Sequence, residues 1–153
     1  MPTTEEQATH LQQIIYDTIP LSRVMELKIS HVDSNSIKIT APVATANANI
    51  HNTAFAGSIY SICALSAWAL VHNRLMQENI STEVVLAQAN IRYLLPINES
   101  INASCSIEED DYQSFNNRLQ NKGKASIAVV VSAQEEDKIQ ATLDARVAVK
   151  IVS

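Results

Sequence analysis

The segment from residue 49 to residue 58 holds the groups in this chain that are best suited to chemistry. It contains an amide side chain at Asn49 and an imidazole at His51, and it leads into a long apolar segment. If that apolar segment is a helix, its first turn presents unpaired backbone N–H groups and about half a positive charge. Such a terminus can bind a carbonyl oxygen that gains negative charge during a reaction. The backbone amides concerned are those of Phe55, Ala56, Gly57 and Ser58.

Each of these residues also has a simpler interpretation. Asn49 is compatible with a turn at the helix entry, which is a common role for asparagine. His51, with an ordinary pKa near 6.5, can give a proton to a reacting carbon or can be a plain loop histidine. Asn52 and Thr53 are typical capping and loop residues, whereas Gly57 allows a ligand to come close to the backbone.

The helix that follows lacks a carboxylate. An Asp or Glu is one of the groups that can activate water for hydrolysis, and the sequence from Ser58 to Gln77 contains neither. The first carboxylate is Glu78, and the position two turns beyond Gly57 is Ala64. The sequence therefore favours a reaction that needs no general base.

One long helix must position this site. No charged residue occurs between Lys38 and Arg74. The second part of this stretch predicts a helix over 56–77 that is apolar on all sides because protein surrounds it. Serines and a glycine interrupt it, and so we interpret it as a core helix and not as a membrane span.

The remaining pattern predicts one helix followed mainly by strands. A first helix is expected over Thr4–Ile19, with Thr3 or Thr4 as the N-cap and Pro20 as the stop. Residues 111–120 form a short helix or a long loop. Alternating apolar and polar residues predict the strands Glu26–Val32, Ser36–Val43, Glu83–Leu95, Ser100–Glu108, Lys124–Glu135 and Lys138–Val152.

Strands with one polar face must be covered on the other face. The helix over 56–77 is the one element apolar enough to cover them. The sequence thus predicts an α+β fold of the hot-dog type, a curved antiparallel sheet wrapped around a central helix. With 153 residues and no visible linker or repeat, residues 1–153 form a single domain.

Composition excludes several classes of protein. Hydrophobic residues make up 46% and charged residues 18%, which is typical of a globular domain. The net charge of −5 argues against a nucleic-acid partner. Cys63 and Cys105 have no metal-ligand or disulfide spacing, and we expect no metal and no cofactor. The N-terminus lacks the pattern of a secretory signal, so we expect a cytoplasmic protein with no membrane association.

The segment 49–60 reads Asn-Ile-His-Asn-Thr-Ala-Phe-Ala-Gly-Ser-Ile-Tyr, with Trp68 in the helix and Ile-Arg-Tyr-Leu at 91–94 before Pro96. This combination resembles the hot-dog acyl-thioester enzymes. Within them it is similar to the malonyl-acyl-carrier-protein decarboxylase and thioesterase-like family, which also forms the C-terminal domain of acetyltransferase fusions. Here we expect the stand-alone form. The sequence departs from the broader family at Asn52, Phe55 and Ala56, where Gly, His and Gly are usual.

The resemblance implies an acyl thioester substrate on acyl carrier protein or coenzyme A. It favours decarboxylation of malonyl-acyl carrier protein to acetyl-acyl carrier protein, which primes fatty-acid synthesis, with Asn49 and His51 as catalytic residues. A hydrolytic thioesterase and a non-catalytic acyl-carrier-binding domain remain alternatives. Open strand edges predict a homodimer or a higher homo-oligomer. The basic cluster available for a phosphopantetheine phosphate or an acidic carrier comprises Arg92, Arg118, Lys122 and Lys124; solvated surface charges are the simpler interpretation of these residues.

Overall fold

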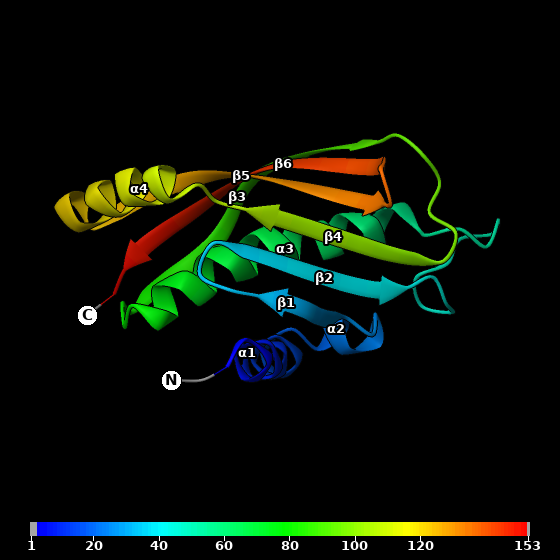
Figure 1. The fold of residues 1–153 in the computed structure, drawn as a ribbon, viewed down its shortest axis with the longest axis horizontal. Coiled ribbons are helices and arrows are strands. Elements are labelled where there is room, and N and C mark those ends of the chain that lie inside the picture. Colours follow the sequence, from blue (N-terminus) through cyan, green and yellow to red (C-terminus); the bar gives the residue numbers. More distant parts are fainter. Residues whose placement is uncertain (1–2, 153) are drawn as a thin grey trace.

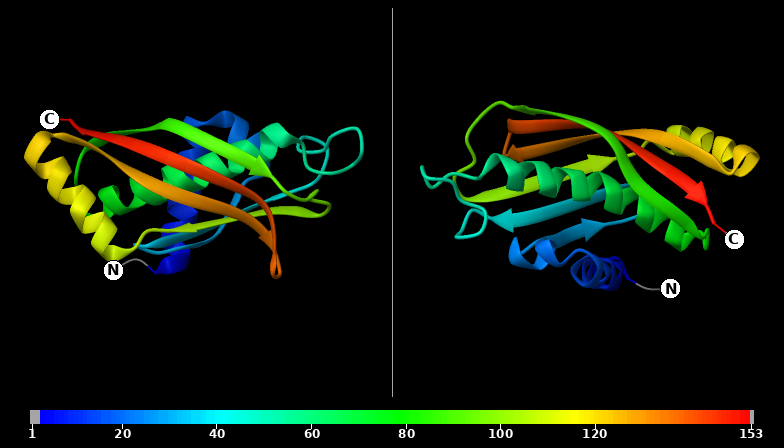
Figure 2. Two further views of the ribbon diagram at one scale, coloured as in Figure 1. Left: turned by 90° about the horizontal axis from the view of Figure 1, so that it is seen from above. Right: turned by 180° about the vertical axis from the view of Figure 1, so that it is seen from behind.

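A six-stranded antiparallel sheet curves around one long helix, α3 (Ala56–Gln77), in the strand order β1-β2-β4-β5-β6-β3. The computed structural model describes residues 3–152. Figure 1 looks onto the sheet with α3 behind it, and the view from behind in Figure 2 shows α3 lying along the inner side of the curved sheet. The predicted α+β fold of the hot-dog type is confirmed.

The strands follow from the alternation of apolar and polar residues. On β6, for example, alternate residues from Leu143 to Val149 are buried, whereas Asp144 and Arg146 between them are exposed. The first strand is two residues shorter than predicted, because Glu26 has a left-handed φ of 57° and ends the preceding turn. The strands are β1 (Lys28–Val32), β2 (Ser36–Pro42), β3 (Thr82–Tyr93), β4 (Ser100–Ser106), β5 (Lys124–Glu135) and β6 (Lys138–Ile151).

Three further helices surround this unit. Helix α1 (Thr4–Thr18) packs on β1, and its N-cap is Thr3, whose Oγ1 accepts a hydrogen bond from the Glu6 amide at 3.1 Å. Helix α2 (Pro20–Val24) follows directly. The segment expected as a short helix or a loop is helix α4 (Glu109–Lys122), which Gly123 ends in the left-handed conformation at φ 75°.

The buried core explains why α3 is apolar on nearly every side. Ile62, Ala67 and Leu70 are fully buried between the helix and the sheet. The polar Ser66 is also buried and is satisfied because its hydroxyl donates to the Ile62 carbonyl at 2.7 Å. Within the described residues no helix is long and apolar enough to cross a membrane.

Hydrogen bonds from Arg74 connect the C-terminal end of α3 to the rest of the fold. The Arg74 side chain is only 10% exposed, and its guanidinium stacks on the Tyr112 ring at 3.8 Å. It donates to Glu78 at 2.8 Å, to Glu109 at 2.9 Å and to Asn35 Oδ1 at 2.7 Å. One side chain thereby joins α3, α4 and the turn between β1 and β2. The N-terminal end of α3 is left free for a site.

Candidate active site

The chain enters α3 through a loop whose shape Asn49 determines. Its Oδ1 accepts hydrogen bonds from the amides of His51 at 2.9 Å and Thr53 at 3.2 Å, and its Nδ2 donates to Thr53 Oγ1 at 2.8 Å. A second contact of Nδ2, to the Ala54 carbonyl, is long at 3.4 Å. The turn role that the sequence left open is therefore present, and one N–H of the amide is only weakly engaged.

The first turn of α3 offers two backbone amides. The amides of Ser58 and Ile59 both donate to the Phe55 carbonyl, at 3.0 and 3.1 Å, and the Phe55 amide donates to the Asn47 carbonyl at 2.7 Å. Within residues 3–152, the amides of Ala56 and Gly57 have no backbone acceptor. Of the four amides expected from the sequence, the structure thus leaves two available and engages those of Phe55 and Ser58 within the fold.

Gly57 provides space for an aromatic ring. A Cβ at this position would lie 2.4 Å from Phe55 Cε2, so that the Phe55 ring rests directly on the glycine. The ring is itself half exposed. The close approach that the sequence assigned to a ligand is occupied here by Phe55, whose half-exposed side chain lies over Gly57.

A pocket of about 340 Å³ opens beside this helix terminus. The loop and α3 form one wall, and the end of β3 with the segment after it forms the other. The lining residues are Asn49, Ala54, Ala56, Ile59, Tyr93, Leu94, Leu95, Pro96 and Ile97. The lining therefore contains no carboxylate, imidazole or basic side chain, and its only polar side chains are an amide and a phenol.

The phenol belongs to Tyr93, which sequence reasoning did not assign to the site. Its hydroxyl donates to the Ala56 carbonyl at 2.9 Å and so joins the last residue of β3 to the first residue of α3. Burial, with further contributions from Cys63 and Tyr60, raises its pKa above the ordinary value. The signal was the Ile-Arg-Tyr-Leu motif, which carried the family resemblance but gave no role to the tyrosine.

His51 does not lie at this pocket. It is exposed on the loop, and it is not among the lining residues. Its backbone amide, which donates to Asn49 Oδ1, is the part of His51 that contributes to the loop.

A second cavity, of about 260 Å³, runs along the half-buried side of α3. It lies between α2, α3 and β3 and is almost entirely apolar. Trp68 forms its end, where the indole Nε1 donates to the Val84 carbonyl at 2.7 Å. We call this cavity the apolar groove; its lining is Ile19, Leu21, Met25, Tyr60, Ser61, Ala64, Leu65, Trp68 and Leu86.

The predicted basic cluster is divided within one chain. Arg92 pairs with Thr142 of β6, whereas Lys124 of β5 pairs with Lys150 of β6. Eight residues along β6 separate these positions, or about 26 Å at 3.3 Å per residue. Within one chain the sheet register therefore holds Arg92 near the pocket and the other basic residues at the far end.

The residues at the far end surround a hollow of about 550 Å³ on the outer face of the sheet. Its basic rim consists of Lys122, Lys124 and Lys150, and Glu83 is the one acidic residue of its lining. The exposed Val85 contributes to an apolar floor. The fourth predicted residue, Arg118, is tied to the Ser126 carbonyl at 2.9 Å on the same side.

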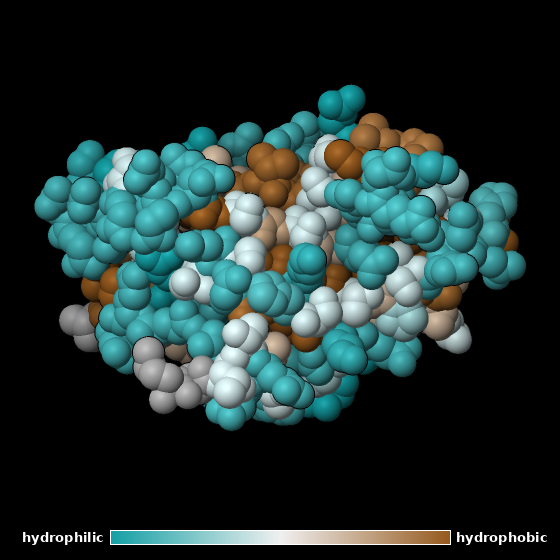
Figure 3. Space-filling view, viewed as in Figure 1, coloured by the Kyte–Doolittle hydropathy of each residue, from teal (hydrophilic) through white to brown (hydrophobic). Residues whose placement is uncertain are grey.

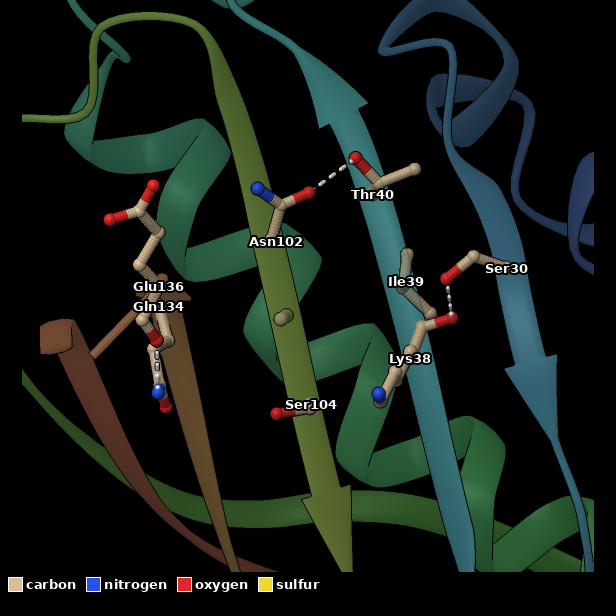
Figure 4. Close-up of a pocket in the computed structure, with 9 residues that line it drawn as sticks. Ser30, Lys38, Ile39, Thr40, Asn102, Ser104, Gln134 and Glu136 are labelled. Carbon is tan, nitrogen blue, oxygen red and sulfur yellow. Dashed lines mark hydrogen bonds between the residues drawn. The ribbon is translucent and has the colours of Figure 1, made fainter. Parts of the chain in front are cut away.

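Two other features do not provide a reactive site. Figure 4 shows a polar hollow on the outer face of β2 and β4, where Thr40 donates to Asn102 at 2.9 Å, away from the start of α3. Figure 3 shows the same face as largely hydrophilic, with apolar residues gathered along its upper rim. Cys63 and Cys105 are buried, and burial raises both thiol pKa values to about 12, so that neither thiol is a ready nucleophile.

Known structures share this architecture over nearly the whole chain. A putative thioesterase from Shewanella oneidensis is 30% identical with a TM-score of 0.85, covering 97% of this chain and 99% of that one. A protein of unknown function from Chlorobaculum tepidum is 27% identical with a TM-score of 0.90 and covers 98% of both chains. A "probable thioesterase" from Pseudomonas aeruginosa, at 17% identity and a TM-score of 0.83 with 99% of both chains covered, shares the fold.

The family comparison agrees with the geometry of the helix terminus. Residues 8–150 match the family described as "Putative thioesterase (yiiD_Cterm)". The match includes the loop, α3 and the end of β3 that together form the pocket. The first residue of α3, Ala56, lines this pocket, and a helix N-terminus can stabilise a carbonyl oxygen that gains negative charge. The chain belongs to this thioesterase-like family.

Proposed function

We propose that this chain decarboxylates the malonyl thioester of acyl carrier protein and gives the acetyl thioester that primes fatty-acid synthesis. The observation that carries the proposal is the absence of a carboxylate from the pocket lining and from the whole of α3. Hydrolysis needs a base to activate water. Decarboxylation needs none, because the departing carbon dioxide leaves its bonding electrons on the substrate.

The helix terminus stabilises the charge that this step creates. When the bond between the carboxyl carbon and the α-carbon breaks, its electrons move into the thioester and form an enolate oxygen. In this proposal the amide of Ala56, a residue that lines the pocket and has no backbone acceptor for its N–H, donates to that oxygen, and the unpaired amide of Gly57 follows it in the first turn. The wall beside Ala56 is apolar, with Ile97 buried and with Leu94 and Leu95 half exposed, and a bound substrate that covers it strengthens these hydrogen bonds.

Asn49 acts in two ways in this proposal. Its Oδ1 and one N–H fix the loop that orients the helix terminus. The second N–H, held only by the long contact to Ala54, faces a pocket that Asn49 lines and can donate to the malonyl carboxylate or to the thioester carbonyl. A neutral amide binds the carboxylate without repelling it.

Substitution of Asn49 tests the proposal. Asn49→Ala removes one donor to the transition state, and we expect a loss of about 2.7–4 kcal/mol, or about a hundredfold to a thousandfold in kcat. Thr53→Val is the matched control, since it removes the acceptor of Nδ2 and leaves Asn49 in place. Equal losses in both variants would reduce Asn49 to a loop residue. Mass spectrometry of malonyl-acyl carrier protein separates acetyl carrier, free carrier and unchanged substrate.

Asn49→Asp separates the two enzymatic functions. Aspartate retains the Oδ1 that accepts from the amides of His51 and Thr53, so that the loop keeps most of its hydrogen bonds. The added negative charge repels the malonyl carboxylate and the enolate, and decarboxylation should fall. A hydrolase that lacks only a base would instead gain hydrolytic activity from the same change.

The apolar groove favours the second candidate function, a thioesterase acting on longer acyl chains. Its nearly apolar lining along α3 suits a hydrocarbon chain better than it suits a malonyl carboxylate. Release of free carrier protein or coenzyme A from an octanoyl thioester, with malonyl carrier unchanged, would select this alternative. No release from the octanoyl thioester, together with malonyl carrier that stays unchanged, would select a non-catalytic binding domain.

The proposed enzyme works as a homodimer joined through β3. This strand is 12 residues long, lies at the edge of the sheet and exposes the apolar Val85 on its outer face. Such an edge pairs readily with a second copy. We expect light scattering to give at least twice the 16.8 kDa of one chain, and a mass near 16.8 kDa would contradict the dimer.

Pairing of the two β3 strands also brings the separated basic residues together. In one chain, ten residues of β3 separate Glu83, beside the basic rim, from Tyr93 at the pocket. At 3.3 Å per residue, that distance is about 33 Å. A phosphopantetheine chain has about as many bonds as five extended residues and therefore spans at most about 18 Å. Antiparallel pairing about the middle of β3 places the basic rim of one chain beside Arg92 and the pocket of the other. We propose that the carrier docks across this boundary.

A further inference from the structure

We propose that the hydroxyl of Tyr93 is the acid that protonates the enolate carbon and completes the acetyl group. The inference rests on the proposed decarboxylation and assigns its second step to a residue. After carbon dioxide leaves, the α-carbon carries an electron pair and must gain one proton. The pocket must therefore supply a proton donor as well as a binding site for the enolate oxygen.

Tyr93 is the proton-donating side chain that the pocket provides. Among its nine lining residues, seven are apolar, Asn49 carries a neutral amide, and Tyr93 carries an O–H group. An amide is not a useful acid at neutral pH. His51, which also has a suitable proton, is exposed on the loop and does not line the pocket.

The hydroxyl is held at the reacting end of the helix. It donates to the Ala56 carbonyl at 2.9 Å, and the Ala56 amide is one of the two free donors for the enolate oxygen. Tyr93 is itself fixed because its strand position pairs with Ala141, and the next amide, of Leu94, donates to the Gln140 carbonyl at 2.8 Å. A rotation about the C–O bond turns the hydrogen from the Ala56 carbonyl toward a substrate in the pocket.

The surroundings keep the proton on this hydroxyl until it is used. Burial raises the pKa of Tyr93, and the two ionisable groups that act on it, Cys63 and Tyr60 of α3, raise it further. The pocket lining contributes no acidic or basic side chain, and the nearest charged residue in sequence is Arg92 on the same strand. The hydroxyl is therefore neutral at physiological pH and available as a donor.

The step balances without any added reagent. The O–H bond of Tyr93 breaks, a C–H bond forms at the α-carbon, and the enolate returns its electrons to give the acetyl thioester. The tyrosinate then takes a proton from water at the open side of the pocket. The overall change is malonyl thioester and one proton to acetyl thioester and carbon dioxide.

Tyr93→Phe keeps the ring and removes the proton. We expect kcat for malonyl-acyl carrier protein to fall about a hundredfold, which is typical of the loss of a general acid, with little change in KM. Tyr16→Phe is the matched control: it also removes a hydroxyl that donates to a backbone carbonyl, that of Leu27, and neither residue lines the pocket. A tyrosine that only fastens β3 to α3 would lower the melting temperature and leave kcat nearly unchanged.

The pH profile distinguishes an acid from a structural residue. Wild-type kcat should fall at high pH as Tyr93 loses its proton, and this limb should disappear in Tyr93→Phe. Replacement of Tyr93 by 3,5-difluorotyrosine keeps the hydrogen bond and the fold but lowers the phenol pKa, so the limb should move to lower pH. A limb that does not move, or a Tyr93→Phe variant with full kcat, overturns the proposal. Wild-type protein that releases no carbon dioxide overturns the proposed function itself.

Discussion

Reversal of the basic rim tests whether the carrier protein docks on one subunit and reacts in the other. Lys122→Glu combined with Lys124→Glu replaces two positive charges with negative ones at the hollow beside β3. An exposed ion pair contributes about 0.5 kcal/mol, and reversal adds a repulsion of similar size, so two reversals cost about 2 kcal/mol. This amounts to about a thirtyfold loss in kcat/KM, mainly through KM, and the loss should shrink at high salt.

Mixed dimers provide the decisive assay. One subunit carries the reversed rim with an intact pocket, and the other carries an intact rim with the pocket inactivated by Asn49→Ala and Tyr93→Phe. If docking crosses the boundary, the mixed dimer contains one productive combination of rim and pocket and recovers about half of the wild-type activity. Each parent homodimer stays low. Purification through two different affinity tags isolates the mixed species.

The result that refutes the reasoning is a mixed dimer as weak as the reversed parent. The intact pocket would then depend on the basic rim of its own chain. Our estimate excludes this, because the rim and the pocket of one chain are about 33 Å apart along β3 and the phosphopantetheine chain spans about 18 Å. If the reversed homodimer keeps its full activity, Lys122 and Lys124 are solvated surface charges with no role in carrier binding. Circular dichroism should be unaffected in the reversed variant, because both lysines are exposed.

The other predictions concern α3. Arg74→Met should destabilise the fold by about 3 kcal/mol, or roughly 6–12 °C in Tm, because the nearly buried guanidinium links three partners that lose their hydrogen bonds together. Arg23→Met should cost less than about 1 kcal/mol, since its pair with Asp17 is exposed; equal melting shifts would contradict this. The Arg74 guanidinium lowers the pKa of Glu109 to about 2. Wild-type stability should therefore decline as pH falls from 4.5 toward 2, and denaturant titration should find a shallower decline in Arg74→Met. Ala64→Asp should introduce measurable hydrolysis of the acetyl thioester, assayed as free carrier.

The sequence was sufficient to predict the sheet and the central helix because both depend on hydrophobic periodicity. The helix over 56–77 and the strand over 124–135 have the predicted ends. Errors occur where a local hydrogen bond or a backbone angle sets the end of an element. The first strand begins late because of the left-handed Glu26. Helix α4 is two residues longer at each end than the predicted segment 111–120, and Gly123 ends it.

The site was predictable only in the part that is local in sequence. The loop and the helix terminus are contiguous, so Asn49, Ala56 and Gly57 could be grouped from the sequence. Tyr93 reaches the same point from 37 residues away, through a strand pairing that no spacing rule gives. For the same reason Arg92 was grouped with basic residues that the sheet register holds far from it.

The lack of a carboxylate on α3 is not a consequence of burial. Most of the helix is enclosed, and an unpaired Asp there would be destabilising. The side that faces the apolar groove is different: Ala64 is only half buried, and a carboxylate on that side would remain partly solvated. The fold therefore permits a general base two turns beyond Gly57, where this chain has a methyl group. The backbone donors for a thioester oxygen are present, and a carboxylate base is absent from a position that could hold one. The site therefore fits a reaction that generates its own carbanion better than it fits a reaction that must activate water.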